Sequence, residues 1–200
     1  MIHFIVATIK EARPLIDFYK LKKKNSSSQF QIFLNQNISL TVSKIGKINS
    51  AISVCHTFFE LGKKNNQIWI NFGLAGIKNL NIGELILVDK VVDNDSNKQF
   101  FPYLIKDLKI KQKSCVTFSR QNEKLDKFLS DMECSGFFQS SSIFSSKELI
   151  HSIKMISDNE FESINFSNDQ QIYNIVNERI CDIDEFVNKI WKTWDEFYKK

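Results

Sequence analysis

The chain has 200 residues and a formal net charge of +4, with 42 % apolar and 25 % charged residues. These values predict one folded domain over residues 1–200 with a packed core, and they exclude a disordered chain. No segment reaches the roughly 18 apolar residues of a membrane span, so we expect no membrane partner. Positive charge gathers at 20–24 and 106–113, in expected loops. Short runs of this kind are typical of solvated surface, so no nucleic-acid partner is expected.

The four cysteines, at positions 55, 115, 134 and 181, show no Cys-x-x-Cys motif and no close spacing. Zinc sites and disulfide scaffolds both need such spacings, so we expect neither, and no metal or cofactor is predicted. A reducing, cytoplasmic location fits this pattern best. The N-terminal stretch MIHFIVATI lacks a basic leader and a cleavage signal, so it is not expected to be a signal peptide.

Short apolar stretches rich in β-branched residues predict strands, and apolar residues spaced by three and four predict helices. In chain order, the expected elements are strands at 2–9 and 39–45, a helix at 49–62, a strand at 67–72 that enters a turn at 73–76, strands at 84–92 and 113–119, a helix after 131–133, a strand at 152–157 and one long helix at about 169–198. The helix at 49–62 would be capped by Asn49 or Ser50 and would end at Gly62.

Short buried strands that alternate with helices predict an α/β layered fold. In such folds the functional site lies beyond the carboxyl ends of the strands. Acids follow several of the expected strands or apolar runs, and we expect them at one rim: Glu11, Asp93, Asp95, Glu133 and Asp158. Any one acid after a strand is more often a helix cap or a solvated loop residue.

Several carboxylates in one cleft suit acid–base chemistry on a neutral or cationic substrate. One carboxyl group can protonate a leaving group while another activates water, as in glycoside hydrolases. Cleavage of the bond between ribose and a base has the same requirements, because the base must be protonated as it leaves.

Six segments, in order along the chain, resemble motifs of one superfamily: ATIKEARPLI (7–16), SKIGKINSAI (43–52), INFGLAGI (70–77), NIGELILVDKVVDND (81–95), DMECSGFFQ (131–139) and IKMISDN (153–159). They resemble the purine nucleoside phosphorylase/nucleosidase superfamily, and within it the methylthioadenosine/S-adenosylhomocysteine nucleosidases and futalosine hydrolase. The resemblance implies a three-layer α/β/α fold with a central mixed β-sheet. It also implies a hydrolase that cleaves the N-glycosidic bond of a purine-type nucleoside, such as methylthioadenosine, S-adenosylhomocysteine or futalosine.

The resemblance assigns roles to residues of this chain. Glu11 resembles the acid that positions and activates water, and Asp158 resembles the acid that protonates or hydrogen-bonds the purine at N7. Met132 and Glu133 resemble the pair that holds the ribose, where a carboxylate suits the two hydroxyls of a cis-diol. The remaining expected substrate contacts are Gly73, Leu74 and Ala75 beside the sugar and Phe118 beside the base.

Two alternatives remain open at this point: a phosphate-dependent nucleoside phosphorylase, and a non-catalytic nucleoside-binding relative. Phosphorylases of this fold hold phosphate with a glycine-rich loop near the first strand, and the corresponding stretch ATIKEARP has no glycine. The family's element that stacks on the base is missing, and CVTFSRQNEK (115–124) stands in its place. Lys154 stands where the family commonly has arginine. The resemblance also implies a homodimer.

Overall fold

The computed structural model describes residues 1–25, 28–105 and 108–198, so Lys106 and Asp107 of the second basic run lie outside the described residues. The described strands are β1 (Ile2–Val6), β2 (Lys22–Lys23), β3 (Gln31–Leu34), β4 (Ile38–Val42), β5 (Ile68–Gly76), β6 (Leu85–Asp93), β7 (Gln99–Phe100), β8 (Lys111–Thr117), β9 (Leu129–Asp131) and β10 (Ile150–Asp158). The helices are α1 (Ile9–Phe18), α2 (Lys47–Glu60), α3 (Cys134–Ser141), α4 (Asp169–Asn177) and α5 (Ile180–Tyr198), with a short 3-10 turn at Lys147–Leu149.

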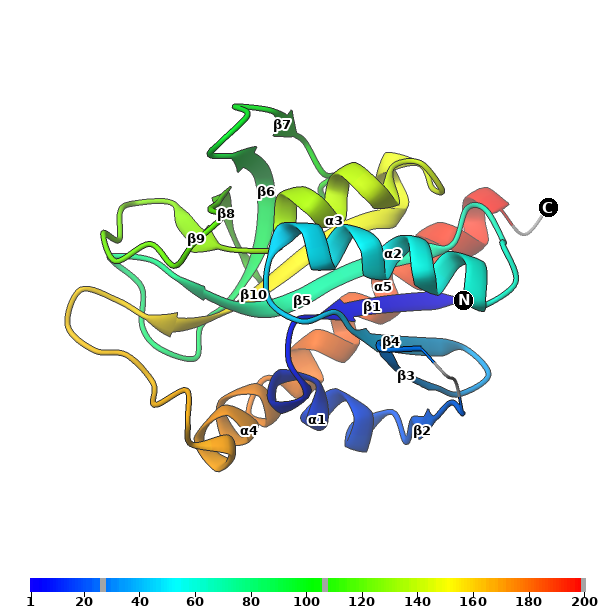
Figure 1. Ribbon diagram of the computed structural model, residues 1–200, viewed down its shortest axis with the longest axis horizontal. Coiled ribbons are helices and arrows are strands. Elements are labelled where there is room, and N and C mark those ends of the chain that lie inside the picture. Colours follow the sequence, from blue (N-terminus) through cyan, green and yellow to red (C-terminus); the bar gives the residue numbers. More distant parts are fainter. Residues whose placement is uncertain (26–27, 106–107, 199–200) are drawn as a thin grey trace.

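The strands form one mixed sheet in the order β10-β6-β8-β9-β5-β1-β4-β3-β2, and β7 pairs with β6. Strand β10 also pairs with β5, so β10, β6, β8, β9 and β5 close into a ring. The pairs that carry the expected site, β1 with β5 and β5 with β10, are parallel. Their carboxyl ends therefore lie at the same edge of the sheet (Figure 1).

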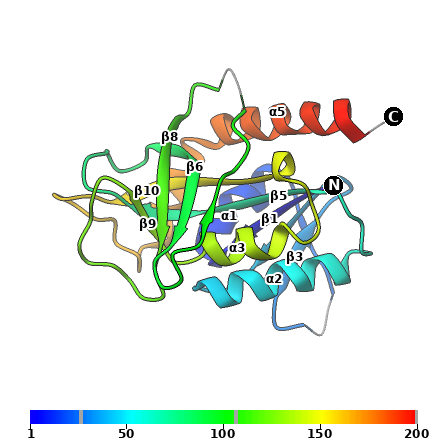
Figure 2. The same cartoon turned by 90° about the horizontal axis from the view of Figure 1, so that it is seen from above.

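Successive side chains of β1 point to opposite faces of the sheet, and each face has its own hydrophobic core. Phe4 and Val6 face the core that contains the apolar side chains of α1, α4 and α5, whereas Ile5 faces the core beneath α2 and α3. Figure 2 shows α5 on the opposite side of the sheet from α2 and α3. The arrangement is the three-layer α/β/α fold with a mixed sheet that the sequence predicts.

Several of the expected boundaries were wrong. Helix α2 begins at Lys47 with Gly46 as its N-cap, so neither Asn49 nor Ser50 caps it, although Gly62 does follow its end with a φ of +97°. Residues 73–76 are not a turn, because they continue β5.

The long helix expected at 169–198 is two helices, α4 and α5, separated by Glu178 and Arg179. The Arg179 Nε donates to the carbonyl of Gly83 across this break. The predicted apolar stripe nevertheless continues through both helices, since Ile172, Val176, Ile183 and Ile190 are all buried.

Helix α1, which is separated from β1 by two residues, is not among the elements expected from the sequence. The Thr8 side chain caps it by accepting from the Glu11 N–H, and Ala12, Leu15 and Ile16 bury its inner face. This helix fixes the backbone of Glu11 at the carboxyl edge of the sheet.

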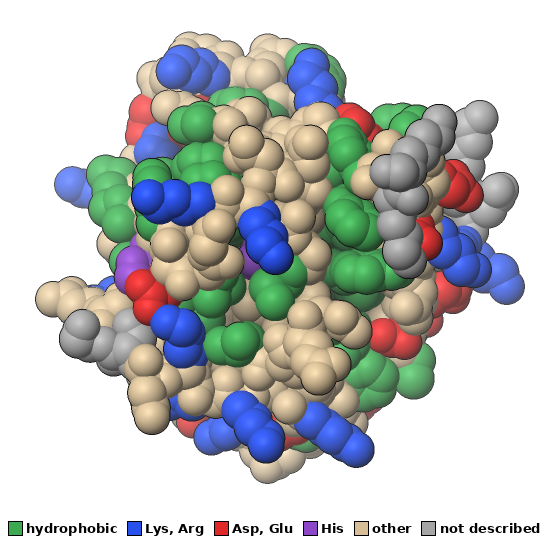
Figure 3. Space-filling model, turned by 90° about the vertical axis from the view of Figure 1, so that its right-hand side faces the viewer, with side chains coloured by type: hydrophobic (Ala, Val, Ile, Leu, Met, Phe, Trp, Pro, Cys, Tyr) green, Lys and Arg blue, Asp and Glu red, His purple; other side chains and the backbone are tan. Residues whose placement is uncertain are grey.

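Lysine and arginine side chains are spread among apolar and neutral ones on the face of the molecule in Figure 3. Of the first basic run, Lys24 pairs with Glu60. None of the helices in the described part of the chain combines the length and the apolar character that crossing a bilayer requires.

Candidate active site

A cavity of about 550 Å³ opens at the carboxyl edge of the sheet. Its walls come from the ends of β1, β5, β9 and β10, together with residues of α1 and α4. The lining includes Thr8, Glu11, Ile45, Leu74, Ala75, Gly76, Gln121, Asn122, Asp131, Met132, Glu133, Ser157, Asp158, Phe166 and Ile172. Its volume lies within the range of small-molecule sites, and it combines apolar walls with a few convergent polar groups.

Glu11 projects into the cavity from the first turn of α1 and is only 6 % exposed. Its Oε1 accepts a hydrogen bond from the Thr8 hydroxyl at 2.6 Å, and its Oε2 accepts one from the Leu74 N–H at 3.2 Å. Burial raises the pKa of Glu11 above its ordinary value, although the Thr8 hydrogen bond and the Lys154 charge oppose the rise. A carboxylate with a raised pKa is a better proton acceptor near neutral pH.

Glu133 enters the same cavity from the start of α3 and is 8 % exposed. Its Oε1 accepts a hydrogen bond from the Gly46 N–H at 2.8 Å. Burial, the Asp131 carboxylate and the Glu11 carboxylate raise its pKa to about 7, while Lys154 and the Gly46 N–H oppose them. The two glutamates therefore act on each other electrostatically within one buried site.

An ion pair lies beneath these two glutamates. Lys154 Nζ is 2.8 Å from Asp131 Oδ2, and both side chains are fully buried. Burial opposes the charge on Lys154, but the Asp131 and Glu133 carboxylates outweigh it and raise its pKa above the ordinary value. The Asp131 Oδ2 also accepts the N–H groups of Glu133 and Cys134, so the pair fixes the backbone that carries Glu133.

Asp158 ends β10 on the other side of the cavity and is partly exposed. Its Oδ1 accepts a hydrogen bond from the Ser157 hydroxyl at 2.6 Å. The carboxylate lies directly against Gly76, because a Cβ at position 76 would be 2.1 Å from the Asp158 Oδ2. Glycine is therefore required at position 76 for Asp158 to take this position.

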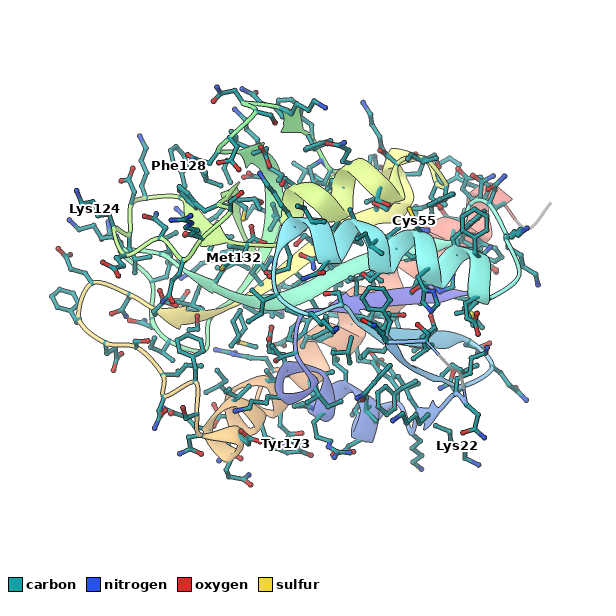
Figure 4. The ribbon with its side chains drawn as sticks, viewed as in Figure 1. Lys22, Cys55, Lys124, Phe128, Met132 and Tyr173 are labelled. Atoms are coloured by element: carbon teal, nitrogen blue, oxygen red, sulfur yellow. The ribbon has the colours of Figure 1, made fainter. Side chains whose placement is uncertain are left out.

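The other expected site residues divide into two groups. Met132, Leu74 and Ala75 line the cavity. Figure 4 shows Met132 nearer the middle of the molecule than Lys124 and Phe128, which lie toward its outer edge. Gly73 and Phe118 are not among the described lining residues. Gly73 instead lies behind Glu11, since a Cβ there would be 3.1 Å from the Glu11 Oε2. For Phe118, the structure gives no support to the expected position beside a base.

Asp93 and Asp95, which the sequence placed at the same rim, lie elsewhere. Lys47 Nζ is 2.7 Å from an Asp93 oxygen and 2.6 Å from an Asp95 oxygen, beside a separate groove between α2 and α3. Burial works against the charge on Asp93, but hydrogen bonds from Lys47 and Ser135 outweigh it and lower its pKa. These two acids therefore anchor the start of α2 and do not contribute to the cavity.

The fold brings together two cysteines that are distant in sequence. The ligating atoms of Cys115, Asp131 and Cys134 all lie within 4.8 Å of one another. The cluster does not suit a metal ion, because the Asp131 oxygens already accept hydrogen bonds from Thr117, Glu133 and Cys134 and pair with Lys154. Burial also raises the pKa of the Cys115 thiol, which disfavours the thiolate that a metal needs.

No protein-family model and no curated protein matches the chain in sequence. Solved structures match it closely in shape. The 5'-methylthioadenosine nucleosidase of Arabidopsis thaliana aligns with a TM-score of 0.79 at 16 % identity, over 94 % of this chain and 95 % of that one. The 5'-methylthioadenosine/S-adenosylhomocysteine nucleosidase of Neisseria meningitidis, in complex with methylthio-immucillin-A, aligns with a TM-score of 0.71 at 16 % identity. The alignment covers 96 % of this chain and 98 % of that one. A futalosine hydrolase mutant of Helicobacter pylori aligns with a TM-score of 0.71 at 14 % identity, over 94 % of this chain and 98 % of that one. The chain has the nucleosidase fold.

Within this fold, two features of the site are not apparent from the sequence. The Lys154–Asp131 pair joins β10 to β9, and only the sheet topology brings them together. The second feature is the segment 118–128, which contributes Gln121 and Asn122 to the cavity. The polar side chains of this loop indicate from the sequence that it could contribute to a site. They do not show which of its residues faces the cavity.

Proposed function

We propose that this protein hydrolyses the N-glycosidic bond of a purine-type nucleoside to give a free base and a sugar. The observation that supports this most directly is that Glu11, Glu133 and Asp158 line one cavity of about 550 Å³. Two of these acids are buried with raised pKa values, and the third is partly exposed on the opposite wall. Separate environments for two or more carboxyl groups suit separate acid, base and binding roles.

In the proposed reaction, the ionised Glu133 accepts hydrogen bonds from the two ribose hydroxyls. Asp158 donates a proton to the base as the glycosidic bond lengthens, and positive charge develops on the sugar. Glu11 removes a proton from the attacking water, which forms the new bond to the anomeric carbon. The Thr8 hydroxyl and the Leu74 N–H orient the Glu11 carboxylate for that step. The reaction needs no redox change, and the proton lost from water balances the proton given to the base.

The neighbours in structure suggest the substrates to try first. Their names specify 5'-methylthioadenosine, S-adenosylhomocysteine and futalosine. The decisive assay measures free-base release from these three nucleosides, adenosine and inosine, with and without phosphate. Release that does not need phosphate supports a hydrolase, whereas release that requires phosphate would assign a phosphorylase. A folded protein that binds a nucleoside without releasing base would be the non-catalytic relative.

We also propose that residues 1–200 act as one nucleosidase-like domain in the cytoplasm, and that the chain forms a homodimer. The outer face of α2 exposes Ile48, Ile52 and Phe59, with exposed fractions of 71 %, 50 % and 58 %. Ile143 at the end of α3 is 72 % exposed and lines the same groove as Ile48 and Ile52. An apolar surface of this kind is typical of an interface between protein chains.

The dimer is tested by light scattering on the purified chain at micromolar concentration. The variant Ile48→Asp places a charge in the centre of the apolar face and is expected to give monomers. Phe161→Asp is the matched control, since Phe161 is 89 % exposed and lies outside the groove. A wild type that is monomeric, or an Ile48→Asp variant that stays dimeric, would contradict the proposal.

A further inference from the structure

The segment 118–128 overlaps the stretch 115–124 that stands in place of the family's base-stacking element, and it packs over the Asp158 end of the cavity. Leu125 lies close enough that a Cβ at Gly76 would be 2.7 Å from its Cδ2, and the same Cβ would contact the Asp158 carboxylate. The Lys78 N–H donates to the carbonyl of Asp126 at 2.9 Å, which fastens the segment to the chain beyond β5. If Asp158 meets the leaving base, this segment lies beside that base.

Two amide side chains of this segment line the cavity, and they differ in whether they already form hydrogen bonds within the protein. The Asn122 amide is committed to a local turn, because its Nδ2 donates to the Lys124 carbonyl and its Oδ1 accepts from the Lys124 N–H. Gln121 lines the cavity and is exposed, and its side chain makes no hydrogen bond to any other described residue. Its amide is therefore available to a ligand.

We propose that Gln121 is a specificity-determining residue that recognises the substituent at position 6 of the purine, and that it allows the site to accept both 6-amino- and 6-oxopurine nucleosides. The inference rests on the proposed function. In a purine, N7 and the 6-substituent lie on the same edge of the ring. Gln121 lines the same cavity as Asp158, and its segment lies beside the Asp158 carboxylate through Leu125. Its amide is therefore placed to reach the 6-substituent of a base whose N7 meets Asp158. Glutamine is suited to this edge, since amides pair with adenine at N6 and N7 in nucleic-acid recognition.

The reason for dual acceptance is the chemistry of the amide. Its carbonyl oxygen accepts from a 6-amino group, and its NH2 group donates to a 6-oxo group. Rotation of the amide by half a turn exchanges the two, and no hydrogen bond to a described residue fixes one orientation. A carboxylate at this position only accepts, and an ammonium only donates.

The test measures kcat/KM on pairs of nucleosides that share a sugar and differ only at position 6, such as adenosine and inosine or their 5'-methylthio forms. Wild type is expected to cleave both members of a pair with kcat/KM values within about tenfold. Gln121→Glu is expected to shift the ratio about tenfold toward the 6-amino member, and Gln121→Lys to shift it about tenfold toward the 6-oxo member. The control is Glu123→Lys, an exposed residue of the same segment that does not line the cavity.

Opposite shifts in the two Gln121 variants, with an unchanged ratio in the Glu123→Lys control, would support the role. A wild type that cleaves nucleosides while both Gln121 variants keep its ratio would overturn this inference and leave the proposed function standing. A wild type that strongly prefers one member would overturn the dual acceptance. A wild type that releases no base from any nucleoside would overturn the proposed function, and this inference with it.

Discussion

The substitution Glu133→Gln separates the proposed ribose-binding role of this residue from its effect on folding. Glutamine has almost the same shape and keeps the Oε1 that accepts from the Gly46 N–H. It removes the negative charge that burial and the Asp131 and Glu11 carboxylates disfavour. We therefore expect a variant that loses activity by several orders of magnitude and becomes more stable at neutral pH.

The size of the stability gain follows from the pKa of Glu133. That pKa rises from 4.5 to about 7 on folding. Since each pH unit corresponds to about 1.4 kcal/mol, the ionised form costs about 3 kcal/mol above pH 7. A group with a raised pKa stabilises the fold fully below the unfolded value and loses that contribution as pH rises through the folded value. The advantage of Glu133→Gln should thus be absent below pH 4.5, grow up to about pH 7 and stay constant above it.

The measurement is urea unfolding of both proteins at pH 4.5 and pH 8, together with base release at pH 8. Glu123→Gln, an exposed acid outside the cavity, is the control and should change neither property. A Glu133→Gln protein with full turnover would refute the ribose-binding role. A variant with the same stability as wild type at both pH values would refute the electrostatic reasoning.

Three further outcomes are expected. Because the proposed ribose binding needs the ionised Glu133, with a pKa of about 7, kcat/KM should fall about tenfold for each pH unit below 7, and a flat profile from pH 5 to 8 would contradict this. Gly76→Ala should lower kcat and change KM less, as measured by steady-state kinetics. The reason is that the alanine Cβ would come within 2.1 Å of the present position of the Asp158 Oδ2 and would displace that carboxylate. Lys154→Met leaves the buried Asp131 without a cation and should cost about 3–5 kcal/mol in urea unfolding, while Lys154→Arg should retain most of the stability.

Much of the fold could be predicted from the sequence, because many strands and helices are recognisable from the pattern of their own residues alone. The β-branched stretch of β1 predicts a strand, and the apolar stripe of α4 and α5 predicts helical structure, although it does not show the break between them. Short edge elements carry too little pattern, so β2, with two exposed lysines, and β7 were missed. Helix α1 was missed because the first strand was expected to continue to residue 9, where α1 begins, and because Pro14 lies within the helix.

The candidate site was predictable to the extent that its residues follow strands. Glu11 and Asp158 come directly after or at the end of parallel strands, so a shared edge follows from the fold class. Asp93 also ends a strand, yet it faces away, because β6 lies on the far side of the ring and its end meets Lys47. The direction in which a strand end points depends on closure of the sheet, and nothing local in the sequence encodes that closure.

The charges around the cavity bear on the choice of nucleophile. The acidic lining residues Glu11, Asp131, Glu133 and Asp158 face a single cation among the described lining residues, Lys10. That lysine is already engaged, since its Nζ lies 2.6 Å from Asp169 and donates to the Phe166 carbonyl.

A phosphate ion that attacks the sugar would have to enter this field carrying one or two negative charges. The buried Lys154 offers little compensation, because it is paired with Asp131. Two like charges 4 Å apart repel by about 4 kcal/mol at the effective dielectric constant of a protein surface, and several carboxylates would act together. Water enters such a field without that penalty and finds in Glu11 a proton acceptor. In the proposed reaction, the same negative field stabilises the positive charge that develops on the ribose, so the electrostatics that disfavour phosphate would also favour cleavage by water.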